Sequence, residues 1–145
     1  MSAVLAKLSK LTELDASDII AGRNTEEAVE VLEIISAGVN KSGAKLVTLN
    51  LSDNAFGLRG IKAITQLFQG QNELLHVYFN NNGLQGDAVN LLVEHIVSSH
   101  DDKKSKLHSF EIFNNLLTDA GAIALVPLIE ASPQLQHFRM VNDTQ

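Results

Sequence analysis

The sequence has no cysteine among its 145 residues. It therefore has no disulfide framework, no thiolate nucleophile and no cysteine-type zinc or iron–sulfur site, which fits a reducing compartment. Long apolar runs are also missing: none approaches the roughly 18 residues that a membrane span requires. The first 15 residues lack a continuous apolar stretch followed by a cleavage site. We therefore expect a soluble, intracellular protein without a membrane span.

Positive charge is scarce as well. Lys and Arg number 11 against 17 Asp and Glu, which gives a formal net charge of −6. A general binder of the phosphate backbone carries the opposite sign, so nucleic acid is not an expected partner. The length suits one domain, residues 1–145, and the hydrophobic fraction of 45% is ample for its core.

What the sequence does contain is a repeat. The template L-x-x-L-x-L-x-x-N, with a variable last position, fits five times, starting at residues 11, 46, 74, 107 and 135. The starts are separated by 35, 28, 33 and 28 residues. A period near 28 with local insertions is typical of the long, helix-containing leucine-rich repeat. The mixed charge run at residues 98–106 is expected to be a solvated loop inserted between two units.

Each template predicts a short strand, then a turn and an amphipathic helix. Apolar residues recur with helical spacing in three helical halves: Ile61, Ile64, Leu67 and Phe68; Val89, Leu92 and Ile96; Ile123, Leu125, Leu128 and Ile129. We expect an α/β leucine-rich-repeat solenoid of about five units, with parallel strands on the concave face and helices on the convex face.

Neither end of this solenoid resembles a complete cap. An open end exposes apolar side chains and an unpaired strand edge, which terminal repeats normally cover. Residues 2–9 and 141–145 do not supply such a cover. We therefore expect either a fragment of a longer solenoid or an additional chain that covers an open end.

Stacked repeats place equivalent residues side by side, about 4.8 Å apart. The last template position forms one column: Ile19, Asn54, Asn82, Asn115 and Asp143. Its asparagines are expected to hydrogen-bond the backbone of adjacent turns, where no regular ladder satisfies the amides. The preceding position forms a second column: Asp18, Asp53, Asn81, Asn114 and Asn142. These side chains are expected to point out from the rim, free for a partner.

No motif for an enzyme of its own is present, since the sequence lacks a phosphate loop, a zinc-protease helix and a nucleophile elbow. His76 and His137 share one strand column with two strand spacings between them, roughly 10 Å, which is too far to share a metal ion. His108 sits one residue off that column. We expect no metal and no cofactor, and we interpret the histidines as surface packing.

The same alignment of equivalent positions predicts where the carboxylates lie. Asp15 and Glu111 are three repeats apart, so they are not expected to form an acid–base pair. Glu13, Asp15, Asp18 and Asp53 are expected to cluster at one end of the concave face and its rim. Two interpretations stay open: this cluster serves solubility, or it is a docking patch for a basic partner.

Arg23 is the residue that local structure explains least. Asn24 and Glu27 form an N-terminal capping pattern for a helix, and a cation just before a helix start is unfavourable by roughly 0.3–1 kcal/mol. Another interaction of Arg23 should offset this unfavourable energy. Either Arg23 makes an exposed ion pair with Glu26 or Glu27, worth about 0–1 kcal/mol, or it has a function.

Three blocks of the sequence together resemble the Ran GTPase-activating proteins. LNLSDNAFG at 49–57 and VYFNNNGL at 77–84 resemble two successive repeats of that family, and SDIIAGR at 17–23 resembles the segment that carries its essential arginine. The order and spacing of the blocks agree, and the similarity runs from about Leu11 to the end. LDASDIIAGRNTEEAVEVL and FEIFNNLLTDAGA look closest to the plant branch.

The resemblance implies roles for individual residues. Arg23 corresponds to the essential arginine, and Asn81 to the rim asparagine that reaches into the GTPase active site. Family members insert no arginine finger but position the GTPase's own glutamine and attacking water. Rim residues expected to contact the partner are Asp18, Asp53, Asn80 and Asn114.

The chain also departs from the family pattern. An arginine-containing stretch of fungal and animal members is replaced here by Phe-Asn-Asn-Leu at 113–116, as it is in the plant branch. The family's solenoid is also considerably longer and ends in an acidic tail that is absent here.

The function that follows is activation of a Ran-type small GTPase by a protein that is not itself an enzyme. The resemblance implies a role in nucleocytoplasmic transport and a location in the cytoplasm or at the outer nuclear envelope. The alternative is a non-catalytic leucine-rich-repeat scaffold subunit of a larger assembly, which the shortness of the chain favours.

Overall fold

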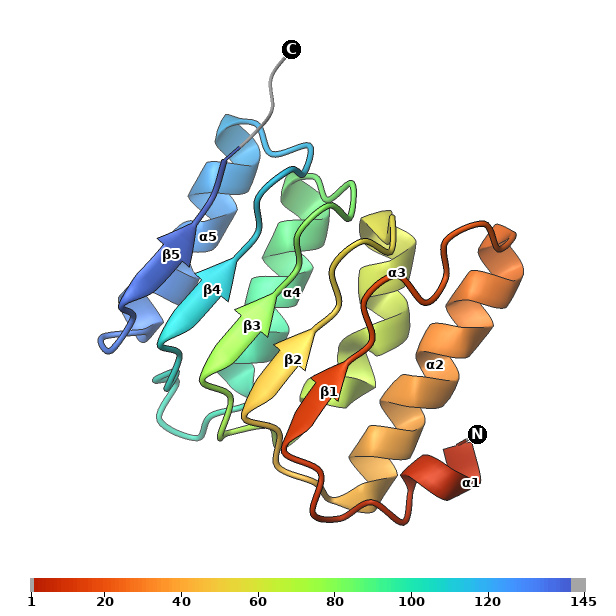
Figure 1. Ribbon diagram of the computed structural model, residues 1–145. Helices are drawn as coiled ribbons and strands as arrows, with labels where there is room; N and C mark the ends of the chain where they lie inside the picture. Colours follow the sequence, from red (N-terminus) through yellow and green to blue (C-terminus); the bar gives the residue numbers. More distant parts are fainter. Residues whose placement is uncertain (1, 142–145) are drawn as a thin grey trace.

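The computed structural model describes residues 2–141, and five short strands form one parallel sheet in the order β1-β2-β3-β4-β5 (Figure 1). The strands are β1 (Glu13–Asp15), β2 (Thr48–Asn50), β3 (His76–Tyr78), β4 (Ser109–Glu111) and β5 (His137–Arg139). Each strand pairs with the next one along the chain, so order in sequence is order in space. All five lie within the predicted templates, and the predicted α/β class with parallel strands is confirmed. Asn142 and Asp143, which the template columns include, lie outside the described residues.

Helices follow β1, β2, β3 and β4 and cover one face of the sheet, which leaves the other face open, and one short helix precedes β1 (Figure 1). They are α1 (Ser2–Leu5), α2 (Thr25–Ser42), α3 (Gly57–Ile64), the 3-10 helix η1 (Thr65–Phe68), α4 (Gly86–Ser98) and α5 (Asp119–Ala131). Successive helices from α2 to α5 contact one another. This arrangement is compatible with leucine-rich repeats. Within residues 2–141, no helix is long and apolar enough to cross a membrane.

The core lies between the sheet and the helices because the middle residue of each strand points inward. Leu49, Val77 and Phe110 are neighbours in the strand register and are fully buried. Side chains alternate across a strand, so the residues before and after each of these face the open side. Behind β3, Phe79 packs between Phe56 and Phe68. Its ring centroid lies 6.2 Å from that of Phe56 and 6.5 Å from that of Phe68.

The last helix departs from the apolar pattern that the sequence suggests. Leu125 and Leu128 of α5 are buried, whereas Ile123 and Ile129 are 70% and 44% exposed. Helix α5 packs against α4 on one side only, and no further helix follows it among the described residues. The two isoleucines are exposed because they lie outside the contact with α4.

Candidate functional site

The turns that follow β1, β2, β3 and β4 line one edge of the sheet (Figure 1). Asp18, Asp53, Asn81 and Asn114 occupy equivalent positions in these turns, and all four are exposed. Each has a left-handed backbone, with φ values of 52°, 63°, 56° and 53°. Asn and Asp tolerate this conformation better than most residues with a side chain. The left-handed backbone was not among the features predicted from the sequence, although a column that holds only Asn and Asp is its signal.

A ladder of buried asparagines supports the turns from below. The Oδ1 atom of Asn54 accepts from the Ile19 backbone N–H at 2.9 Å, and Asn82 Oδ1 accepts from Asn54 N–H at 2.8 Å. Asn115 Oδ1 continues the series by accepting from Asn82 N–H at 2.9 Å. The three asparagines are 0–7% exposed. The predicted ladder is therefore confirmed for these residues. It ties the position of each turn to that of the next turn.

The exposed rim residues bond to each other above this ladder. Asn81 Nδ2 donates to Asp53 Oδ1 at 2.8 Å, and Asn114 Nδ2 donates to Asn81 Oδ1 at 2.9 Å. The prediction that these side chains project from the rim is confirmed. Adjacent turns bring the amide and carboxylate groups of Asp53, Asn81 and Asn114 within hydrogen-bond distance, so part of each polar group is used within the chain. Contact between these exposed residues and a partner stays a prediction.

Asn80 differs from these rim residues because it is half-buried, in the segment that follows β3. Its Nδ2 donates to Glu111 Oε2 at 3.0 Å, and its Oδ1 accepts from the Phe113 backbone N–H at 3.1 Å. Both ends of the amide thus hold the neighbouring turn. Contact between Asn80 and a partner stays a prediction.

Arg23 lies in the loop between β1 and α2 and is exposed. Its Nε donates to the Ile19 carbonyl oxygen at 3.2 Å. Among residues 2–141 it makes no ion pair, so the first of the two alternatives, a pair with Glu26 or Glu27, is contradicted. A carbonyl of its own loop holds the cation instead, and the two Nη atoms have no hydrogen-bond partner in the part of the chain that is described.

The helix start next to Arg23 follows the predicted capping pattern. Asn24 precedes α2 with an extended backbone, and its Oδ1 accepts from the Glu27 backbone N–H at 2.9 Å. This bond satisfies one of the free amides of the first helical turn. The cap therefore anchors the end of the loop that carries Arg23 to the first turn of α2.

Arg23 and Asn81 flank the same turn, the one that follows β2. Arg23 lines a hollow of about 170 Å³ together with Asn54, Ala55 and Phe56 of that turn. Asn81 reaches the turn from the β3 side through its bond to Asp53. The two predicted functional residues are therefore both exposed at the same edge of the sheet, with one turn between them.

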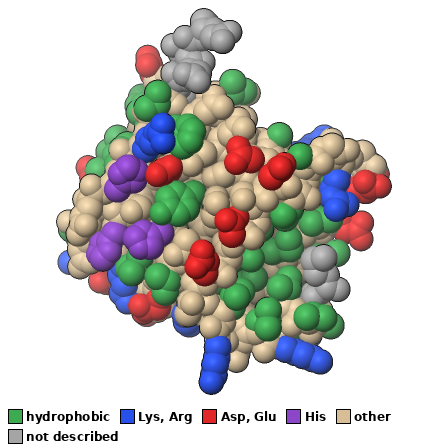
Figure 2. All heavy atoms as spheres, viewed as in Figure 1, with side chains coloured by type: hydrophobic (Ala, Val, Ile, Leu, Met, Phe, Trp, Pro, Cys, Tyr) green, Lys and Arg blue, Asp and Glu red, His purple; other side chains and the backbone are tan. Residues whose placement is uncertain are grey.

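The open face of the sheet carries acidic side chains toward β1 and at the turn edge (Figure 2). Asp15 Oδ1 accepts from the Ser17 hydroxyl at 2.6 Å and from the Ser17 backbone N–H at 3.0 Å. These bonds, with a weaker contribution from Asn50, lower the pKa of the Asp15 carboxyl from its ordinary value. The register runs from Asp15 through Asn50 and Tyr78 to Glu111, so the two carboxylates are three strands apart, as predicted.

Histidines lie toward the other side of this face (Figure 2). His76 and His137 both pair with Ser109 and are two strands apart, as predicted. His137 Nε2 lies 2.9 Å from Glu111 Oε1, and the His76 and His108 rings meet edge to face with centroids 6.4 Å apart. No group of three or more side chains suited to a metal ion occurs within residues 2–141.

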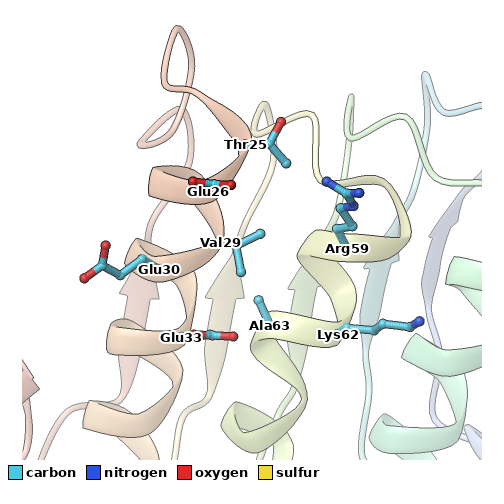
Figure 3. A pocket seen from close by; sticks show the side chains of 8 residues that line it. All are labelled: Thr25, Glu26, Val29, Glu30, Glu33, Arg59, Lys62 and Ala63. Atoms are coloured by element: carbon cyan, nitrogen blue, oxygen red, sulfur yellow. The ribbon is translucent and has the colours of Figure 1, made fainter.

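A second hollow, of about 450 Å³, lies between α2 and α3 on the helix side of the molecule. Figure 3 shows Val29 and Ala63 facing this groove, with Glu33 on the α2 side and Arg59 and Lys62 on the α3 side. The mixed charges favour no single ligand chemistry. The rim at the turn edge is therefore the stronger candidate site, because there the exposed groups have fixed positions.

Comparison with known proteins finds several relatives named Ran GTPase-activating proteins, while no family model matches the chain. The chain is 46% identical over 69 residues to RAN GTPase-activating protein 1 of Arabidopsis thaliana, an alignment that covers 48% of the chain and 12% of that protein. It is 42% identical over 76 residues to RAN GTPase-activating protein 2 of the same plant, covering 52% of the chain and 14% of that protein. Ran GTPase-activating protein 1 of Xenopus laevis is 29% identical over 146 aligned positions, covering 94% of the chain and 25% of that protein.

These matches confirm the resemblance drawn from the three sequence blocks, and the two plant proteins show the higher identities of the three. The chain spans between 12% and 25% of the length of these relatives.

Proposed function

We propose that this chain forms leucine-rich repeats of a Ran GTPase-activating protein and that it accelerates GTP hydrolysis by a bound Ran-type small GTPase. The names of the relatives supply the activity, since each is a Ran GTPase-activating protein. One structural observation carries the proposal to specific residues: Arg23 and Asn81 are both exposed at the turn edge and flank the turn after β2.

In this proposal the chemistry takes place in the GTPase, and the chain supplies no nucleophile or cofactor of its own. Asn81 orients the GTPase's glutamine and the attacking water, because a fixed hydrogen-bonding group lowers the cost of organising a reacting water. Arg23 holds the interface next to it, with two Nη atoms left for the partner. Neither residue enters the nucleotide as an arginine finger does.

The surrounding rim would provide the contact surface. Asp18 and Asp53 supply negative charge, which steers a basic surface toward the turn edge and raises the association rate. Asn80 and Asn114 complete the expected contact set. A location in the cytoplasm or at the outer nuclear envelope, and a further chain or further repeats beside the described ones, belong to the same proposal.

The test is single-turnover GTP hydrolysis by Ran loaded with GTP, with and without the 145-residue chain. The chain alone should hydrolyse no GTP, and its addition should accelerate hydrolysis by Ran. Arg23→Ala and Asn81→Ala should remove most of the acceleration. Asn90→Ala, the same type of substitution at an exposed position of α4, serves as the control and should act like the wild type.

Unchanged hydrolysis in the presence of the wild-type chain would contradict the proposal for this length of chain. Binding of Ran without acceleration would support the alternative of a non-catalytic scaffold subunit.

A further inference from the structure

The orientation of the Asn81 side-chain amide is determined by its neighbour. Oxygen and nitrogen of an amide are hard to tell apart by shape, so their assignment depends on the hydrogen-bond partners. An ionised Asp53 carboxylate can only accept a hydrogen bond. The atom of Asn81 that lies 2.8 Å from Asp53 Oδ1 must therefore be the nitrogen, Nδ2.

The next turn satisfies the other end of the same amide. Asn81 Oδ1 faces Asn114 and accepts from its Nδ2 at 2.9 Å. Three residues from three successive turns thus form a chain in which each donor points toward Asp53. Asn81 retains one Nδ2–H that no residue within 2–141 uses. Because both ends of the amide are hydrogen-bonded, the position of this remaining donor is fixed.

The backbone and the buried asparagines support this arrangement. Asp53, Asn81 and Asn114 all have φ between 53° and 63°, which projects their side chains from equivalent points of stacked turns. Asn54, Asn82 and Asn115, each the next residue in the chain, lock those turns to one another from below. A hydrogen bond to a charged acceptor is also stronger than one between neutral groups.

We infer that Asp53 is a positioning residue: its carboxylate, with Asn114 on the other side, holds the Asn81 amide so that the remaining Nδ2–H faces a hydrogen-bond acceptor of the bound GTPase. The acceptor is a carbonyl oxygen, such as that of a side-chain amide. The inference rests on the proposed function and assigns Asp53 a role that acts through Asn81. Holding the amide in advance lowers the entropy cost of ordering it during the reaction.

Asp18 provides a matched comparison for Asp53. It occupies the same column, carries the same charge, is exposed and has a φ of 52°. Asn81 donates to Asp53 and not to Asp18. A loss of maximal rate specific to Asp53 is therefore the result expected from its bond to Asn81, whereas a change in half-maximal concentration common to both residues is expected from their charge.

The kinetic experiment measures the maximal rate of Ran-bound GTP hydrolysis and the concentration of chain that gives half of it. Asp53→Gly removes the acceptor and suits the positive φ; it should lower the maximal rate about tenfold, since small misplacement of a reacting group is costly. Asp53→Asn keeps an acceptor oxygen and should restore part of this rate. Asp18→Asn should raise the half-maximal concentration while the maximal rate stays within about twofold of wild type.

A spectroscopic experiment tests the arrangement without any GTPase. In the wild-type chain, the two Asn81 side-chain amide protons should have well-separated resonances, with one shifted by the carboxylate. Asp53→Gly should remove that shift, while Asp18→Asn should leave it in place. A wild-type Asn81 amide with the resonances of a freely solvated amide would overturn the inference, even if the chain activates Ran.

The two experiments separate the inference from the function on which it rests. If wild type activates Ran but Asp53→Gly keeps the full maximal rate, the positioning role is wrong and the proposed function stands. If wild type does not activate Ran, the proposed function fails for this chain, and the role of Asp53 in catalysis fails with it. A retained amide shift would then still support the hydrogen-bonded arrangement itself.

Discussion

The side chain of Asn82 accepts a hydrogen bond from the backbone N–H of Asn54 at 2.8 Å, although the two residues are 28 positions apart in the chain. This bond joins equivalent positions of two successive turns. Asn54 uses its own side chain in the same way toward Ile19. The residues that form the candidate site, one position earlier in each turn, therefore take their places from this buried ladder.

Asn54→Ala should lower the free energy of unfolding by about 2–3 kcal/mol, because it leaves buried backbone groups without partners. Asn54 accepts from the Ile19 N–H at 2.9 Å and donates to the Ala16 and Leu51 carbonyls at 2.9 and 3.0 Å. Denaturant unfolding followed by circular dichroism measures the change. Asn90→Ala, at an exposed position of α4, is the control and should change stability by no more than about 0.5 kcal/mol. A similar small loss for Asn54→Ala would contradict the structural role of the ladder.

Gly60→Ala should also destabilise the fold, by about 1–3 kcal/mol, since an added methyl group overfills a packed site. A Cβ atom at Gly60 would lie 2.6 Å from the Cβ of Phe56. Phe56 is 5% exposed and its ring packs 6.2 Å from that of Phe79, so it has little room to move. Thermal unfolding is the measurement, with Lys62→Ala on the exposed side of the same helix as the comparison. Equal melting temperatures for the two variants would show that the helix shifts easily.

Arg23→Ala should separate function from stability. The side chain is exposed and its bond within residues 2–141 goes to the Ile19 carbonyl, so removing it should change the unfolding free energy by about 0.5 kcal/mol or less. Activation of Ran should fall at least about tenfold if this arginine holds the interface. Arg23→Lys keeps the charge but loses the planar fork of donors, so it should recover only part of the activity. Full activity of Arg23→Ala would remove Arg23 from the site.

Ser17→Ala should raise the pKa of the Asp15 carboxyl toward its ordinary value. The hydroxyl of Ser17 is the largest cause of the lowered pKa, because it donates to the carboxylate at 2.6 Å. A carboxyl whose pKa is lower in the folded state stabilises the fold above its unfolded pKa, and this stabilisation is lost as pH falls through the folded pKa. The variant should therefore have a smaller stabilisation from this carboxyl at neutral pH, and its loss on acidification should be complete at a higher pH than in the wild type. Carbon-13 titration of the Asp15 carboxyl measures the shift, and an unchanged midpoint would refute the assignment of its cause.

Ionic strength should affect binding of Ran more than the chemical step. Asp18 and Asp53 are exposed, and surface charges steer association over distances that salt screens, with a Debye length of about 8 Å at 0.15 M. Raising the salt concentration should raise the half-maximal concentration of chain and leave the maximal rate nearly constant. Asp18→Asn should make this dependence shallower, while Glu94→Gln on α4 should not. A dependence on salt that is equal in all three proteins would show that this edge does not guide association.

Part of the site could be predicted because repeats define equivalence. Asn54, Asn82 and Asn115 end three copies of one template, and a parallel stack places such residues side by side. The N-terminal cap by Asn24 was predictable for a different reason, since capping depends on residues only three positions apart.

Other features could not be predicted because they depend on contacts between turns. The chain of hydrogen bonds from Asn114 through Asn81 to Asp53 requires a left-handed backbone at all three positions. The sequence also does not decide whether Arg23 binds a nearby carboxylate or a backbone carbonyl. In the structure its Nε donates to the Ile19 carbonyl oxygen.

The sequence by itself determined the α/β class, the parallel order of the strands and the identity of the equivalent residues, because periodic apolar spacing leaves few ways to bury the core. Only the tertiary structure decided which polar groups meet at the turn edge. Hydrogen bonds depend on distances of a few tenths of an ångström and on the direction of each donor, and these are set when successive turns pack against one another. Within residues 2–141, Asn81 thereby keeps one amide proton that no other residue uses, rather than an unconstrained side chain.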